Sequence, residues 1–96
     1  MRQVRWLRRA LENLDEEAGY ISKDSPRMAA EFVLHIQGSA AMLAEHPNLG
    51  RPGRIAGTRE LVVTRFSYIL PYRVRGDTVE ILRVFHTARK WPSRMG

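Results

Sequence analysis

The apolar residues of this chain follow two different spacings, and the change from one to the other marks the secondary structure. Near the N-terminus Val4 and Trp6 alternate with polar residues, which predicts a short strand over residues 2–6. Apolar residues then recur every three or four positions, with acidic residues opposite them. That period is typical of an amphipathic helix, which we place over about residues 8–22.

A second helix is predicted after a short break. Ser25 is a suitable N-cap, because its side-chain oxygen can accept a hydrogen bond from a backbone N–H, and Pro26 suits the first helical position. The apolar stripe that follows predicts a helix over roughly residues 26–45, so the two helices form a hairpin. Residues 45–57 hold two prolines and three glycines, and we interpret them as a simple connecting loop.

The rest of the chain predicts three strands, near residues 58–65, 67–75 and 78–86. Gly76 and Asp77 fit a tight hairpin turn between the last two strands. The fold class is therefore α+β: an N-terminal strand, a helical hairpin, and a three-stranded antiparallel meander that completes one sheet. A length of 96 residues corresponds to a single domain, residues 1–96.

Alternation within the meander leaves apolar side chains on both faces of the sheet. Ile69 and Pro71 point to one face, whereas the other receives Tyr68, Leu70 and Tyr72. Two helices cover only one face, so we expect a partner protein, rather than the C-terminal segment, to cover the other. Because Pro71 lacks a backbone N–H, its strand is predicted to lie at an edge or to be bulged at that point.

Composition excludes several kinds of site. The chain has no cysteine, which rules out disulfides and thiolate metal ligands and fits a cytoplasmic protein. No apolar run approaches 18 residues, and the N-terminus lacks the apolar region of a secretion signal. His35, His46 and His86 are far apart with no carboxylate at a ligand spacing, so we expect no metal site. The glycines of 45–57 lack the following Lys-Ser/Thr of a phosphate-binding loop, and we expect no cofactor.

Charge divides the chain into two unequal halves. The formal net charge is +6. Residues 1–50 carry six basic and seven acidic residues, whereas residues 51–96 carry ten basic and three acidic residues. Fourteen of the sixteen basic residues are arginine, whose forked guanidinium group suits phosphate and carboxylate. This pattern predicts an acidic partner, either nucleic acid or an acidic protein segment.

Polar residues at the end of the last predicted strand suggest a catalytic hypothesis. Arg83, His86 and Arg89 would cleave RNA, with the histidine moving a proton and the arginines stabilising the charge that develops when a 2′-hydroxyl attacks. Glu60 is a further acid or base candidate. Other arginines expected on the same rim of the sheet are Arg59 and Arg65. The alternative is that His86 only forms a backbone hydrogen bond at the strand end.

Three segments carry a resemblance to a known family: GTREL (57–61), YILPYRV (68–74) and LRVFHTARKWP (82–92). Over residues 4–92 the chain resembles the RelE/ParE superfamily of bacterial toxins from type II toxin–antitoxin systems. The resemblance implies a sheet with a helical hairpin, and an antitoxin, encoded beside the toxin, that wraps over it and covers basic residues. It also implies that Arg59, Arg83 and residues 86–91 are contact sites. The candidate antitoxin- or target-binding residues are therefore Arg59, Arg65, Arg73, Arg83, Arg89, Lys90 and Trp91.

The superfamily contains two mechanisms. RelE-like members cut mRNA on the ribosome, whereas ParE-like members poison DNA gyrase. This chain has Ile69 and Leu70 where many RelE-type nucleases have an arginine, and no tyrosine follows His86. The ending ILRVFHTAR resembles that of ParE, so the resemblance implies gyrase inhibition. The alternatives are an mRNA endoribonuclease with Arg83, His86 and Arg89 at its active site, and a non-toxic interaction module.

Overall fold

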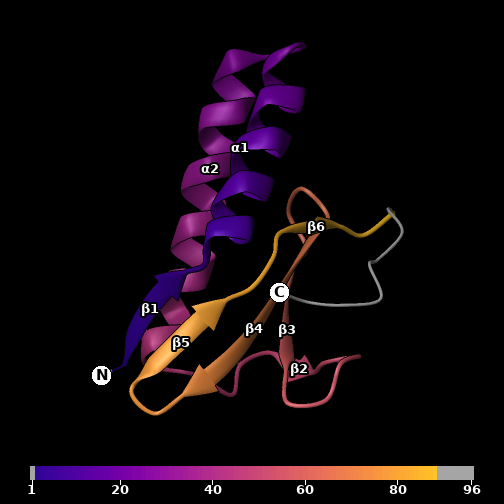
Figure 1. Cartoon of the computed structure of the whole chain (residues 1–96). Helices are drawn as coiled ribbons and strands as arrows, with labels where there is room; N and C mark the ends of the chain where they lie inside the picture. The colour runs from indigo at the N-terminus through magenta and orange to yellow at the C-terminus, as the bar shows by residue number, and fades with distance from the viewer. Residues whose placement is uncertain (1, 89–96) are drawn as a thin grey trace.

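The computed structural model of the chain describes residues 2–88 and shows a mixed sheet with a helical hairpin on one face (Figure 1). The helices are α1 (Arg8–Ser22), α2 (Pro26–Ala41) and the short 3-10 helix η1 (Met42–Ala44). The strands are β1 (Gln3–Trp6), β2 (Arg51–Pro52), β3 (Arg59–Val63), β4 (Tyr68–Arg75), β5 (Thr78–Ile81) and β6 (Phe85–His86). Their order is β1-β5-β4-β3-β2, and β6 also pairs with β4. β1 runs parallel to β5, and the other pairings are antiparallel.

The predicted α+β class and the order of the main elements are confirmed. The predicted hairpin turn is also present: Gly76, at φ +54°, begins the two-residue turn that joins β4 to β5. Two details differ from the prediction. The segment 45–57 contains the short strand β2, and the strand predicted over 78–86 is divided into β5 and β6 by residues 82–84.

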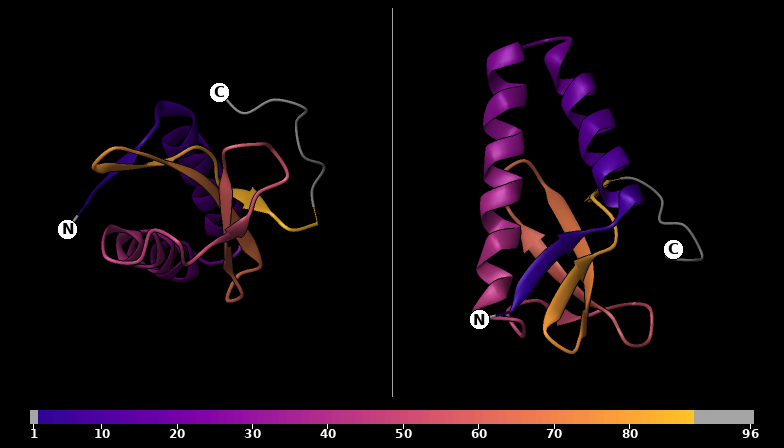
Figure 2. Two further views of the ribbon diagram at one scale, coloured as in Figure 1. Left: turned by 90° about the horizontal axis from the view of Figure 1, so that it is seen from below. Right: turned by 60° about the vertical axis from the view of Figure 1, so that its left-hand side comes forward.

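Helix α2 supplies the centre of the core. The Ser25 hydroxyl accepts a hydrogen bond from the Met28 N–H at 3.1 Å, so the helix begins with the predicted N-cap. Phe32 and Ile36 are fully buried against the sheet side chains Leu70, Tyr72, Val79 and Ile81. Burial of each large apolar side chain contributes roughly 2 kcal/mol. Figure 2 shows the hairpin on one side of the sheet, with its tip reaching beyond the strands.

Pro71 lies in a central strand, and its partner strand is bulged opposite it. Tyr72 pairs with Ile81, but Ile69 pairs with Phe85, so one extra residue is accommodated on the partner side. The Leu82 N–H still donates to the Pro71 carbonyl at 2.9 Å. The reciprocal hydrogen bond, from the backbone nitrogen of residue 71 to the partner strand, cannot form because proline has no N–H. The bulged alternative of the prediction is therefore confirmed.

The sheet face opposite the helices is not left bare. Its apolar residues Ile69, Pro71 and Leu82 are buried within the chain itself. Among the described strands, Val62 is the one large apolar side chain of this face that is widely exposed, at 43%. The expectation that an uncovered apolar face requires a partner protein is therefore wrong for this part of the sheet.

The phenol of Tyr72 fastens the loop after η1 to the sheet. Its O–H donates to the Pro47 carbonyl at 2.7 Å, and its oxygen accepts from the Gly50 N–H at 2.9 Å. Gly50 is required there, because a Cβ atom would lie 2.6 Å from the Tyr72 ring. Burial raises the pKa of Tyr72 above its ordinary value of 10.0, against smaller opposing effects of the Gly50 hydrogen bond and Arg59. This contact positions the loop that carries β2.

Replacing Tyr72 with phenylalanine is expected to lower the free energy of unfolding by about 1–3 kcal/mol. The change leaves the Gly50 N–H and the Pro47 carbonyl without their hydrogen-bond partner, while the ring still fills the core. The matched control is Tyr20→Phe, because Tyr20 is 61% exposed; it should change stability by less than about 0.5 kcal/mol. Urea unfolding measures both. Equal effects of the two substitutions would contradict this role of the Tyr72 hydroxyl.

Candidate functional site

A row of charged side chains crosses the sheet face that points away from the helices. Direct pairing puts Arg5 of β1, Glu80 of β5 and Arg73 of β4 in one line across three strands. The neighbouring line joins Glu60 of β3 to Arg51 of β2. Side chains of directly paired residues stand on the same face of a sheet. The two carboxylates and three arginines therefore share one surface.

Glu80 lies beneath the arginines of its own hairpin. The Arg73 Nε donates to its carboxylate at 2.6 Å, and the Arg75 Nε lies 3.8 Å from the same oxygen. The hydrogen bond from Arg73 is the main cause that lowers the pKa of Glu80 below 4.5; burial opposes it, and the charges of Arg73, Arg75 and Arg5 add to it. Glu80 is 7% exposed, whereas the Arg75 side chain is 67% exposed. The negative charge is thus inside and the positive charge outside.

Glu60 has the same arrangement with different arginines. It is 2% exposed, and its Oε1 accepts from the Arg51 Nη2 at 3.1 Å. Its Oε2 accepts from the Arg54 backbone N–H at 2.9 Å and lies 3.7 Å from the Arg54 Nε. The segment 45–57 is therefore more than the predicted connector, because it brings two arginines onto a buried carboxylate of β3. We name the surface of Arg5, Arg51, Arg54, Arg73 and Arg75 the arginine face.

Arg59 and Arg65, which were expected on one rim, lie at opposite ends of β3. The Arg59 Nη1 donates to the Gly50 carbonyl at 2.8 Å, and Arg59 and Arg73 both line a hollow of about 330 Å³. Arg65 follows the other end of the strand and lies 3.6 Å from the carboxylate of Glu31 on α2. Arg59 and Arg73 therefore line the same hollow, and Arg65 lies away from both at the other end of β3.

Arg83 lies in the bulge and is buried beside α1. It is 7% exposed, and burial is the main cause that lowers its pKa, with a further contribution from Arg9 and an opposing one from Glu12. The next residue is fixed to the same helix, because the Val84 N–H donates to the Asn13 Oδ1 at 3.2 Å. The bulge thus docks onto α1 instead of projecting into solvent.

His86 lines a different, mostly apolar pocket of about 480 Å³ between the helical hairpin and β4. Its ring packs edge-on against Tyr68, with 5.2 Å between centroids, and its Nδ1 accepts from the Ala88 N–H at 3.2 Å. The Tyr68 hydroxyl donates to the buried carboxylate of Glu17 at 2.5 Å. Among the described residues that line this pocket there is no lysine or arginine.

The described members of the predicted catalytic set thus lie in three separate surroundings. Arg83 is buried beside α1, and it is not among the described residues of the His86 pocket. Glu60 is engaged by Arg51 and Arg54 on the opposite face of the sheet. The remaining candidates, Arg89, Lys90 and Trp91, lie outside the described residues.

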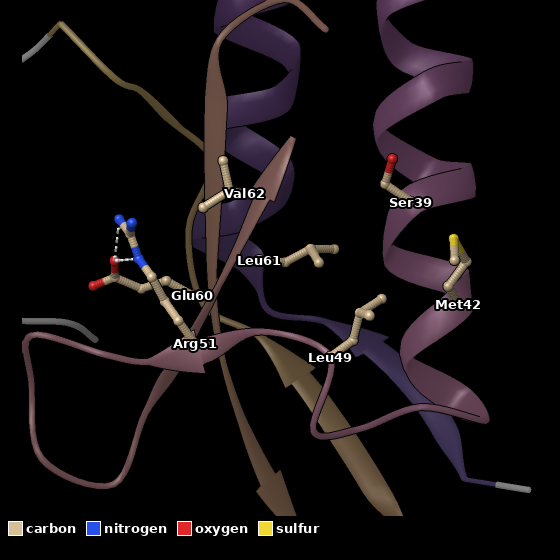
Figure 3. Close-up of a pocket in the computed structure, with 7 residues that line it drawn as sticks. All are labelled: Ser39, Met42, Leu49, Arg51, Glu60, Leu61 and Val62. Carbon is tan, nitrogen blue, oxygen red and sulfur yellow. Dashed lines mark hydrogen bonds and ion pairs between the residues drawn. The ribbon is translucent and has the colours of Figure 1, made fainter. Parts of the chain in front are cut away.

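An apolar groove of about 410 Å³ lies between β3 and the end of α2 (Figure 3). Its exposed apolar side chains are Met42 (53%), Leu49 (50%) and Val62 (43%). Figure 3 shows Leu49 and Leu61 between β3 and the end of α2, with the Arg51–Glu60 pair to the other side. β2 pairs only with the first two residues of β3, so within the described chain the outer edge of β3 is unpaired beyond them. We name this feature the β3 groove.

Comparison with known proteins identifies the family. A family model described as the ParE toxin of the type II toxin–antitoxin system parDE matches residues 4–91. The chain belongs to this family. Membership makes it a toxin of the RelE/ParE superfamily and implies an antitoxin partner.

Individual relatives cover almost the whole toxin. The protein Y4kP of Sinorhizobium fredii is 50% identical, over 95% of this chain and 94% of its own length. Toxin RelE2 of Caulobacter vibrioides is 40% identical, over 93% of this chain and 99% of its own. A solved structure from the chromosomal ParDE system of P. aeruginosa superposes with a TM-score of 0.80 at 29% identity, covering 90% of this chain and 96% of that one.

Two kinds of feature are absent from residues 2–88. No helix in this range is long and apolar enough to cross a membrane. No group of three or more histidine, aspartate or glutamate side chains in this range gathers where it would hold a metal ion.

Replacing Glu80 with glutamine is expected to lower the free energy of unfolding at pH 7 by about 1–3 kcal/mol, because Arg73 loses a charge-assisted hydrogen bond and is only partly compensated by solvent. The native toxin should also lose stability in acid. The pKa of Glu80 is lower in the folded chain than its ordinary value of 4.5. As the pH is lowered below 4.5, the unfolded chain therefore binds more protons than the folded chain, and the free energy of unfolding decreases.

The measurement is urea unfolding at pH 7 and at about pH 3.5. Glu80→Gln should show a smaller acid loss than the native chain, since the titrating group is gone. Glu45→Gln is the matched control, because Glu45 is exposed, and it should behave like the native chain. An unchanged acid loss in Glu80→Gln would show that Glu80 is not responsible.

Proposed function

We propose that this toxin arrests growth by poisoning DNA gyrase and that a tightly bound antitoxin neutralises it. The observation that carries the proposal is the burial of Arg83 beside α1. An RNA-cleaving site needs cations where negative charge develops in the transition state. Arg83 is 7% exposed as a residue, so little of its guanidinium group is accessible to an RNA phosphate, and the described lining of the His86 pocket supplies no other cation.

Gyrase poisoning makes a different demand on the structure, because a poison acts by binding. The matched family is that of the ParE toxin, and the resemblance of the chain to the ParE branch implies gyrase as its target. Candidates for target contact are Arg65, which is exposed, and the half-buried pair formed by Arg59 and Arg73. Arg89, Lys90 and Trp91 remain further candidates on the basis of the sequence.

Neutralisation is proposed to use the β3 groove. Three exposed apolar side chains beside an unpaired strand edge suit an antitoxin segment that places apolar residues in the groove and adds main-chain hydrogen bonds to β3. An interface of this kind gains most of its stability from buried apolar anchors. Met42 and Leu49 are the anchors that this chain offers.

The double substitution Met42→Glu and Leu49→Glu is expected to weaken antitoxin binding at least about 100-fold, because two charges enter an apolar contact. Toxicity in the absence of antitoxin should persist. Leu34→Glu is the matched control, since Leu34 lies on α2, the helix that precedes η1, and is 70% exposed but outside the groove. Co-expression with the antitoxin encoded beside the toxin gives the readout: the groove variant should kill and the control should be neutralised. Neutralisation of both would exclude the groove.

A ribosome-dependent mRNA endoribonuclease is the second candidate. Two observations favour it: His86 lies in a pocket with Tyr68, which is hydrogen-bonded to Glu17, and a relative at 40% identity bears the name RelE2. In that mechanism His86 would act as acid or base. Arg83 and Arg89 would have to stabilise the transition state, which requires Arg83 to leave its buried position.

Labelled thymidine and labelled methionine, pulsed minutes after induction, separate the two candidates. Gyrase poisoning predicts early loss of thymidine incorporation while translation continues. The variant His86→Asn should remain toxic, because it removes the titrating ring but keeps an acceptor near the Ala88 N–H. Early loss of methionine incorporation that disappears in His86→Asn would establish the nuclease instead. A supercoiling assay with purified gyrase and the purified chain then tests the target directly.

A further inference from the structure

The buried carboxylates turn the arginine face into a fixed array of outward positive charge. Glu60 and Glu80 are 2% and 7% exposed, whereas the side chains of Arg51, Arg54 and Arg75 are 53%, 53% and 67% exposed. Five arginines against two carboxylates leave this face a net charge of +3.

The arginines also retain hydrogen-bonding capacity. The contact of Arg73 with Glu80 uses its Nε–H, and a guanidinium group carries five N–H donors. This contact leaves the four N–H donors of the two Arg73 Nη groups unused. Planar groups with several donors suit phosphate oxygens, which they bind in a forked manner. Because the carboxylate below already limits the rotation of Arg73, less conformational entropy is lost when an anion binds.

The dimensions of the face match a polyanion rather than a single ion. Four of its arginines stand on strands from β1 to β2, at the two margins of the sheet, and Arg54 lies in the loop after β2. With strands about 4.8 Å apart, five strands span roughly 19 Å. Duplex DNA carries one negative charge per about 1.7 Å of axis, so about eleven phosphates of its two strands lie within that length.

The face lacks what a protein partner would use. Protein interfaces centre on exposed apolar or aromatic anchors and are depleted of charge at their core. On this face Ile69, Pro71 and Leu82 are already buried, and among its described strand residues Val62 is the one large apolar side chain that is widely exposed, at the margin where the β3 groove begins. A charged surface without anchors fits nucleic acid better than an acidic protein segment.

We propose that the arginine face binds the phosphodiester backbone of nucleic acid directly and without sequence preference. This property goes beyond gyrase poisoning, because it requires neither gyrase nor antitoxin. Its test uses the isolated full chain, so that its failure and the failure of the gyrase proposal are separate results.

The experiment titrates the full chain, made by cell-free synthesis, into a fluorescein-labelled 20-base-pair DNA duplex and into a 20-nucleotide RNA at several KCl concentrations. Fluorescence anisotropy gives the dissociation constant. The face variant is Arg5→Gln, Arg54→Gln and Arg75→Gln, which keeps Arg51 and Arg73 as the nearest partners of the buried carboxylates. The matched control removes the same charge from the exposed helical-hairpin residues Arg8, Lys23 and Arg27, each replaced by glutamine.

The native chain should bind with a dissociation constant of about 1–100 µM near physiological salt. The logarithm of its binding constant should fall linearly with the logarithm of salt concentration, and the face variant should reduce that slope by about 2–3. Its affinity at 0.1 M KCl should fall at least about tenfold, against less than about threefold for the control. The stronger of the DNA and RNA arms identifies the natural source of the phosphates.

Three results would overturn the proposal. The first is an absence of salt-dependent binding to either nucleic acid, and the second is an equal loss of affinity in the face variant and the helical control. The third is tighter, face-dependent binding of a deca-glutamate peptide than of the duplex, which would assign the arginine face to an acidic protein segment. Circular dichroism of each variant confirms that the chains compared are folded.

Discussion

The missing N–H of Pro71 decides how the last part of the described chain is arranged. A central strand forms ladder hydrogen bonds on both sides, and at Pro71 one of them cannot exist. The partner chain therefore leaves the ladder at residues 82–84 and rejoins it one position later. Without that shift Phe85 would stand opposite Tyr68 and His86 would point to the other face, because a slip of one residue exchanges the two sides of a strand. The bulge is thus the reason that His86 packs on Tyr68.

Charge on the outer face depends on a second constraint, which is that a buried carboxylate needs partners. Glu60 and Glu80 would each be strongly destabilising if they were left alone in the sheet. Cross-strand pairing supplies Arg51 to the first and Arg73 to the second. Satisfying these two carboxylates holds several arginines on a rigid surface. The same interactions that stabilise the fold therefore build the feature that is best suited to an anionic target.

Strong periodicity made α1, α2 and β4 predictable from the sequence, but contacts between distant segments were not. The Arg73–Glu80 pair follows from the hairpin, since a two-residue turn fixes which residues face each other. The strand β2 has only two residues and exists because its loop returns to β3, and the parallel pairing of β1 with β5 likewise has no local signal. His86 could be identified as a candidate from its residue type alone. Its neighbour Tyr68, and the Glu17 carboxylate to which Tyr68 is hydrogen-bonded, lie on other elements, and no sequence pattern predicts that these three residues meet.

The Arg51–Glu60 pair connects the two proposed binding surfaces. It lines the β3 groove and also belongs to the arginine face. An antitoxin segment in the groove would extend along the edge of β3 and so lie beside Arg51, where its own volume and any acidic residues would keep phosphate away from that margin of the face. Glu60 would stay paired throughout, because it is already buried in the free toxin. An antitoxin segment in the β3 groove would thus affect both proposed binding surfaces through Arg51, without contact to the His86 pocket on the helix side of the sheet.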